Sequence, residues 1–87
     1  MDYRKTKLYK KLTPYLAAAY AEGFCEGEGA SEQEQLTAWQ YLIDTGQCWK
    51  LQGWYGRTAT ALLEQGLIKQ PIKTHKDYYG NIVKGTE

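Results

Sequence analysis

Few side chains in this chain have the types and spacing that catalysis or metal binding requires. Cys25 and Cys48 lack metal-ligand and redox spacing, so we expect two reduced thiols in or near the core rather than a disulfide. His75 is the only histidine and has no second ligand nearby in sequence, so we expect an exposed loop or strand histidine. Glu26 and Glu28 stand among glycines, as in a solvated connector. We therefore predict a protein that is not an enzyme and uses no metal or cofactor.

The more informative residues are the three tryptophans, Trp39, Trp49 and Trp54, all within residues 38–68. A helical period places Trp49 and Trp54 on the two flanks of an apolar stripe, so one small core does not easily bury all three. Core packing of each tryptophan is the alternative. An exposed aromatic on a rigid helix typically anchors an interface. We predict a protein-binding surface formed by Trp54, Arg57, Lys50 and Trp49.

The strings WQYLIDTG and LQGWYGRTA in this segment resemble a family of short proteins of tailed phages and their environmental relatives, for which no activity is assigned. The resemblance leaves out residues 1–30 and 70–87. Small accessory phage proteins often bind and block a host protein, so the resemblance implies a host protein as partner and a role in host takeover or anti-defence. A structural or homo-oligomeric phage protein, closed through the face from Trp49 to Gly56, is a further alternative.

Length and composition indicate one globular domain. The chain has 87 residues, of which 43% are hydrophobic and 24% charged, ordinary values for a folded protein. No apolar run approaches the roughly 20 residues of a membrane span, and the N-terminus lacks a secretory signal. We expect a cytoplasmic protein, in the host cell if the phage resemblance holds, with no membrane partner.

The charges divide the chain into three parts, although the net charge is only +1. Residues 1–12 carry five basic side chains against one acidic, residues 13–68 carry seven acidic against two basic, and residues 69–84 carry four basic against one acidic. We expect a basic arm at 1–12, a helical core at 13–68 and a basic hairpin or tail at 69–87. A polyanion would meet the two ends first.

Helix signals predict a mainly α domain of three helices with a central αα-hairpin. Thr13-Pro14 is typical of a helix start, and that helix should stop near Gly23. The sequence from Ser31 to Glu34 is a capping box for the second helix, which Gly46 should end. We expect the chain to turn at Thr45-Gly46 into the third helix.

In the third helix, one stripe at 3.6-residue spacing collects the apolar side chains, and Gly66-Leu67 should end the helix. Gly53 and Gly56 in its interior cost roughly 2 kcal/mol of helix propensity together. We expect either another backbone packed against them or a break in the helix. The stripe comprises Cys48, Leu51, Tyr55, Ala59 and Leu62.

After Pro71 the pattern changes to strand. Gly80-Asn81 lies between Tyr78-Tyr79 and Ile82-Val83, which predicts a short C-terminal β-hairpin closed by a two-residue turn, or else an extended tail. A helix followed by a basic hairpin also resembles the recognition helix and wing of a winged-helix domain. In that alternative function, nucleic acid would be contacted by Arg57, Thr60, Lys69, Lys73 and Lys76.

Overall fold

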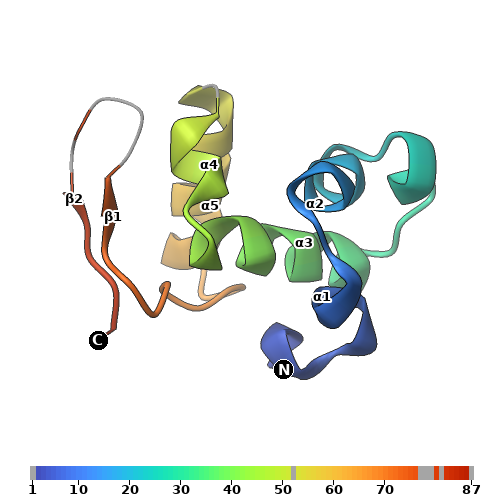
Figure 1. Ribbon diagram of the computed structural model, residues 1–87, viewed down its shortest axis with the longest axis horizontal. Coiled ribbons are helices and arrows are strands. Elements are labelled where there is room, and N and C mark those ends of the chain that lie inside the picture. The colour runs from blue at the N-terminus through green and yellow to red at the C-terminus, as the bar shows by residue number, and fades with distance from the viewer. Residues whose placement is uncertain (1, 52, 77–79, 81, 87) are drawn as a thin grey trace. The chain divides into compact units, whose positions relative to one another are not determined.

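A computed structural model describes the chain apart from residues 1, 52, 77–79, 81 and 87. It forms two compact units, Met1–Leu42 and Ile43–Glu87, and the helix α3 (Glu32–Asp44) runs from the first into the second (Figure 1). The mainly helical class with a small C-terminal sheet is confirmed. The prediction of a single domain is not decided by this division and stays a prediction.

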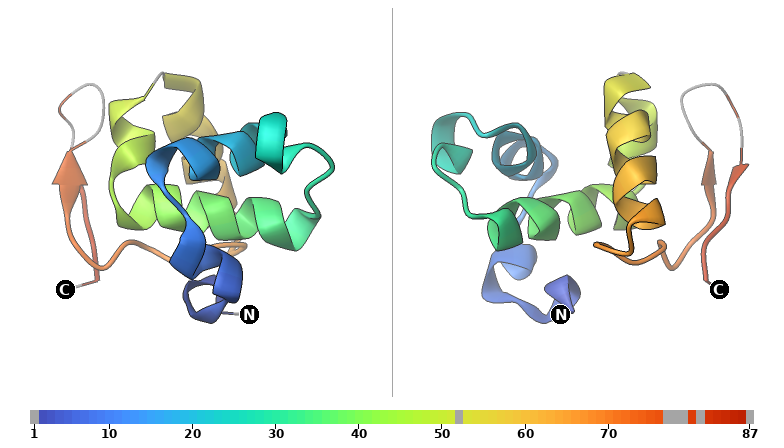
Figure 2. Two further views of the ribbon diagram at one scale, coloured as in Figure 1. Left: turned by 45° about the vertical axis from the view of Figure 1, so that its right-hand side comes forward. Right: turned by 180° about the vertical axis from the view of Figure 1, so that it is seen from behind.

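The first unit contains four helical elements before α3. The basic N-terminal segment forms a 3₁₀ turn, η1 (Tyr3–Lys5), and a short helix, α1 (Lys7–Lys11). The helix α2 (Pro14–Glu22) follows, and a second 3₁₀ turn, η2 (Cys25–Gly27), lies against it (Figures 1 and 2). None of the helices in the described part of the chain is long and apolar enough to cross a membrane.

Local capping explains where these helices begin and end. The Thr13 hydroxyl accepts a hydrogen bond from the Leu16 amide, and Gly23 ends α2 with a left-handed φ of 78°. The predicted capping box is formed reciprocally: the Ser31 amide donates to Glu34 at 2.9 Å, and the Glu34 amide donates to the Ser31 hydroxyl at 3.1 Å. The predicted starts of both helices are confirmed.

The turn η2 packs on the backbone of α2 at Gly27. This glycine is buried, and a Cβ built on it would overlap the Ala19 carbonyl group. Ala17 and Ala19 are themselves fully buried. The alanine-rich face of α2 therefore admits a close backbone contact that only glycine allows.

In the second unit, the chain turns at Gly46, which has a φ of 77°, into α4 (Gln47–Lys50). The helix then breaks: Leu51 is extended, and α5 (Gly53–Glu64) begins two residues later beside α4 (Figures 1 and 2). The predicted turn at Gly46 is confirmed, whereas the predicted single third helix is two helices. The break avoids the predicted loss of stability from a glycine at position 53 inside a helix, because Gly53 is the first residue of α5.

The end of α5 and the start of the C-terminal segment follow local rules. The Leu67 amide donates to the Leu62 carbonyl at 3.0 Å, and the Gly66 amide donates to the Leu63 carbonyl at 3.0 Å. With Gly66 at a φ of 73°, this is the predicted Schellman ending.

The C-terminal hairpin pairs β1 (His75–Lys76) with β2 (Ile82–Val83) in antiparallel register, His75 opposite Val83 and Lys76 opposite Ile82. The predicted hairpin is confirmed. Its predicted two-residue turn at Gly80-Asn81 stays a prediction. Residues 78, 79 and 81, on which that turn depended, lie outside the described residues.

Candidate protein-binding surface

The three tryptophans occupy different environments. Trp39 and Trp49 are 5% and 4% exposed, whereas Trp54 is 43% exposed. Trp49 was expected at the surface with Trp54, and this expectation is wrong. The break after α4 separates the two residues onto different helices, so the position of one no longer sets the position of the other.

Trp54 is exposed because of its position on α5 relative to the buried side of this helix. Tyr55 and Ala59, one turn apart, are buried and fix the inner side of α5. Successive residues of a helix are about 100° apart, so Trp54 lies at the border of that inner side. Its ring meets the Tyr55 ring edge-on, with centroids 4.9 Å apart and an interplanar angle of 84°. This contact supports the tryptophan while much of its ring remains in solvent.

Arg57 lies one turn after Trp54 and is exposed on the same side of α5. The same spacing continues through Ala61 and Glu64, which are also exposed. Lys50, the last residue of the neighbouring helix α4, is exposed as well. We call the row on α5 the α5 surface: Trp54, Arg57, Ala61 and Glu64.

The helices α4 and α5 contact each other where the Trp49 ring covers Gly56. A Cβ on Gly56 would lie 3.6 Å from the Trp49 ring, an ordinary contact distance, so the ring covers this glycine without crowding it. Of the two expected alternatives, a packed backbone or a helix break, the break is observed, and the neighbour of Gly56 is an aromatic ring. Within the described residues, the buried Trp49 indole N–H has no hydrogen-bond partner.

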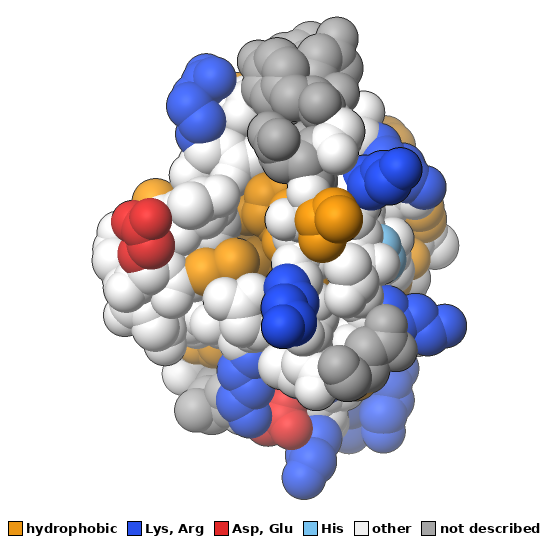
Figure 3. All heavy atoms as spheres, turned by 90° about the vertical axis from the view of Figure 1, so that its left-hand side faces the viewer, with side chains coloured by type: hydrophobic (Ala, Val, Ile, Leu, Met, Phe, Trp, Pro, Cys, Tyr) orange, Lys and Arg blue, Asp and Glu red, His pale blue; other side chains and the backbone are white. Residues whose placement is uncertain are grey.

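The residues expected to contact nucleic acid are spread over several elements of the second unit. Arg57 and Thr60 are exposed on α5, but the Thr60 hydroxyl donates to the Gly56 carbonyl at 2.9 Å. Lys69 and Lys73 are exposed on the segment before β1, and Lys76 is exposed on β1. Figure 3 shows basic side chains standing out over the face that carries the hairpin.

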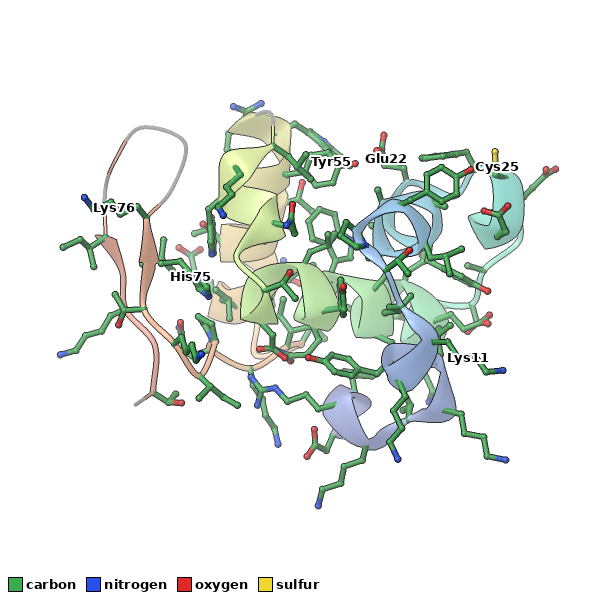
Figure 4. The ribbon with its side chains drawn as sticks, viewed as in Figure 1. Lys11, Glu22, Cys25, Tyr55, His75 and Lys76 are labelled. Atoms are coloured by element: carbon green, nitrogen blue, oxygen red, sulfur yellow. The ribbon has the colours of Figure 1, made fainter. Side chains whose placement is uncertain are left out.

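His75 has a structural role that the sequence did not suggest. Its Nε2 lies 3.2 Å from the Asp44 carbonyl oxygen, at the last residue of α3. A Cβ on Gly46 would lie 2.5 Å from its Nδ1, so the ring sits directly on the α3–α4 turn (Figure 4). Lys76, the next residue, points away from α4 (Figure 4). The histidine therefore holds the hairpin against this turn.

An exposed aromatic pair in the first unit was also missed. Tyr15 and Phe24 are 55% and 39% exposed, and their rings meet edge-on with centroids 6.3 Å apart. A hydrogen bond to the neighbouring Cys25, together with the charges of Cys25 and Glu26, raises the pKa of Tyr15 to about 12. Tyr15 and Phe24 are nine residues apart in the sequence, and the chain reverses between them at Gly23, which has a left-handed φ.

The two cysteines differ from the expectation in one respect. Cys48 is buried, and burial raises the pKa of its thiol above the ordinary value. Cys25 is exposed, so the expectation that it lies in or near the core is wrong. The two thiols are unpaired, and the described residues contain no group of three potential metal ligands.

Most of this chain matches a known protein family. A family model described as a domain of unknown function (DUF7417) matches residues 24–80. The chain belongs to this family. No curated protein and no solved structure matches the chain. The DUF7417 match includes α3, α4, α5 and β1, and therefore the α5 surface and His75, but it leaves out α1, α2 and β2.

Proposed function

We propose that this member of the DUF7417 family acts by binding another protein through the α5 surface, with Lys50 at its margin. The observation that carries the proposal is that Trp54 is exposed, whereas Trp39 and Trp49 are buried. Tryptophan and arginine are the residues most enriched among those that dominate binding energy. In the α5 surface they stand one helical turn apart, on a helix whose other side is fixed by burial.

The chemistry of the α5 surface favours a partner with an apolar pocket and an acidic or aromatic rim. The Trp54 ring would fill the pocket, since most of an indole ring is apolar. Arg57 would pair with a carboxylate or stack on an aromatic face. A central tryptophan of this kind typically contributes 2 kcal/mol or more to binding, as measured by truncation.

We further propose that the partner is a host protein in the cytoplasm of the infected cell, which the chain inhibits or redirects. Support comes from the resemblance of WQYLIDTG and LQGWYGRTA to short phage proteins. A homo-oligomer or structural phage protein would use the same surface against a second copy. Sedimentation of the purified chain separates these alternatives, because only the second gives a concentration-dependent mass.

The experiment that tests the proposal is affinity capture from a bacterial lysate with two immobilised chains, the unchanged protein and Trp54→Ala. We expect at least one protein to be retained by the unchanged chain and lost from the variant. Tyr15→Ala is the matched control, because it removes an exposed ring from the first unit. A set of captured proteins that is the same for all three chains would contradict the proposal.

A second candidate function is nucleic-acid binding by the hairpin. The observation that favours it is the exposure of Lys73, Lys76 and Lys84, for which the described part of the chain shows no ion pair. With Arg57 and Lys69, these side chains would contact phosphates. We expect binding at 150 mM salt to be no tighter than the non-specific range, about 10⁻⁴–10⁻⁶ M.

A further inference from the structure

The short helix α1 gathers three lysines on one exposed side. Its apolar residues face inward: the Tyr9 ring meets the Tyr41 ring of α3 edge-on, with centroids 5.8 Å apart, and Leu12, just past the helix end, is buried. Lys7, Lys10 and Lys11 have the spacing i, i+3 and i+4, which places them on one side of a helix. All three are exposed.

A fourth exposed lysine precedes this group on η1, and none of the four forms an ion pair with a carboxylate that the structure describes. Lys5 is exposed, and the one acidic residue in this segment, Asp2, accepts a hydrogen bond from the Arg4 amide as the cap of η1. The described part of the chain shows no ion pair for these lysines. Lys11 points away from α1 into solvent (Figure 4). We call this group the α1 lysine face: Lys5, Lys7, Lys10 and Lys11.

We propose that the α1 lysine face binds the phosphate backbone of nucleic acid without reading its sequence. The charge is complementary, since the phosphates of a duplex form a dense row of negative charges that lysines neutralise. Lysine side chains supply a positive charge and hydrogen-bond donors, which position a protein on the phosphate backbone. Without other polar side chains beside them, they recognise little of the base sequence. This site lies outside the α5 surface and outside the DUF7417 match.

The residues of α1 favour nucleic acid over a lipid surface as the partner of the α1 lysine face. Helices that bind a bilayer insert an exposed apolar face between the headgroups. The apolar residues Leu8 and Tyr9 of α1 are half-buried and Leu12 is buried, so the lysines stand without an apolar partner for lipid. A purely electrostatic contact fits a polyphosphate better than a bilayer.

Counterion release sets the size of the expected effect. Each phosphate neutralised on a duplex changes the slope of log K against log salt by about −0.9. Four lysines therefore give a slope of about −3.6, and the affinity falls roughly 100-fold between about 50 mM and about 200 mM salt.

The test is the fluorescence anisotropy of a labelled, random-sequence DNA duplex titrated with the full chain over this salt range. The test variant is Lys7→Gln/Lys10→Gln/Lys11→Gln. A comparison variant, Lys73→Gln/Lys76→Gln/Lys84→Gln, removes the same charge from the hairpin and measures the contribution of the second candidate site. The charge-preserving control is Lys7→Arg/Lys10→Arg/Lys11→Arg. We expect the α1 glutamine variant to bind more weakly at low salt with a slope shallower by about 2.7, a larger loss of slope than in the hairpin variant, and the arginine control to keep the slope of the unchanged chain.

Three results would overturn the proposal. They are the absence of duplex binding at about 50 mM salt, a loss of slope confined to the hairpin variant or shared equally by both variants, and binding to phosphatidylserine vesicles that is tighter than binding to the duplex. Circular dichroism checks that both variants are folded. If the α1 glutamine variant unfolds, the single substitutions Lys7→Gln, Lys10→Gln and Lys11→Gln decide the question, because each must make the slope shallower by about 0.9.

Discussion

At the residue scale, Cys25 and Cys48 carry the same thiol in opposite environments. Cys48 is buried, and burial raises its pKa, so its reactive thiolate is scarce near neutral pH. Cys25 is exposed. We expect a thiol reagent such as Ellman's reagent to label one cysteine in the folded protein at neutral pH, and both after denaturation. Labelling of both cysteines before unfolding, or of neither, would contradict these assignments.

Two glycines, Gly27 in η2 and Gly56 in α5, should respond to alanine in opposite ways. At Gly27 a Cβ would overlap the Ala19 backbone, so Gly27→Ala should lower the free energy of unfolding by about 1–3 kcal/mol. At Gly56 a Cβ would make an ordinary contact with the Trp49 ring. There the gain in helix propensity should dominate, and Gly56→Ala should raise the free energy of unfolding by about 0.5–1 kcal/mol. Urea denaturation measures both values, and the opposite pair of signs would refute the packing described for α2 and α5.

At the scale of elements, the turn between α3 and α4 depends on Gly46 for two reasons. Its φ is 77°, and a side chain there would meet the His75 ring. Gly46→Val should therefore cost more than about 1 kcal/mol of stability. Gly66→Val is the matched control: Gly66 has a φ of 73°, but a Cβ on it would meet nothing within 4 Å. Thermal denaturation should show the larger loss for Gly46→Val, and equal losses would mean that the His75 contact contributes nothing.

The elements that the sequence predicted well are those with local causes. The Thr13 cap, the Ser31–Glu34 capping box and the Gly66 ending each depend on atoms a few residues apart. The contact of the hairpin with the α3–α4 turn was not predicted, because His75 and Asp44 are 31 residues apart. No periodic pattern in the sequence carries such a contact.

The residues of the candidate site were predicted only in part, because a helical period captures local spacing but not a break in the helix. The apolar stripe implied by a helical period was sufficient to place Tyr55 and Ala59 inside and Arg57 outside. The period also assumed one straight helix from Cys48 to Glu64. The break at Leu51 invalidates that assumption, and the burial of Trp49 could not be obtained without it.

At the scale of the whole molecule, the two proposed contacts lie on different parts of the chain. The α5 surface lies inside the DUF7417 match at residues 24–80, and the α1 lysine face lies outside it. We therefore expect protein binding to be the activity that members of the family share. The phosphate contact of the basic N-terminal segment would be particular to chains that carry such a segment.

The central claim, that Trp54 binds a partner and does not support the fold, is tested most directly with one variant. Trp54→Ala is titrated against the purified captured protein by calorimetry, with circular dichroism as the check on folding and Tyr15→Ala as the control. We expect a folded variant whose affinity is at least tenfold weaker, with the control unchanged, because an interface anchor typically contributes 2 kcal/mol or more. A core tryptophan would instead cost about 3–5 kcal/mol of folding stability. An unfolded Trp54→Ala, or a folded one with unchanged affinity, would contradict the claim.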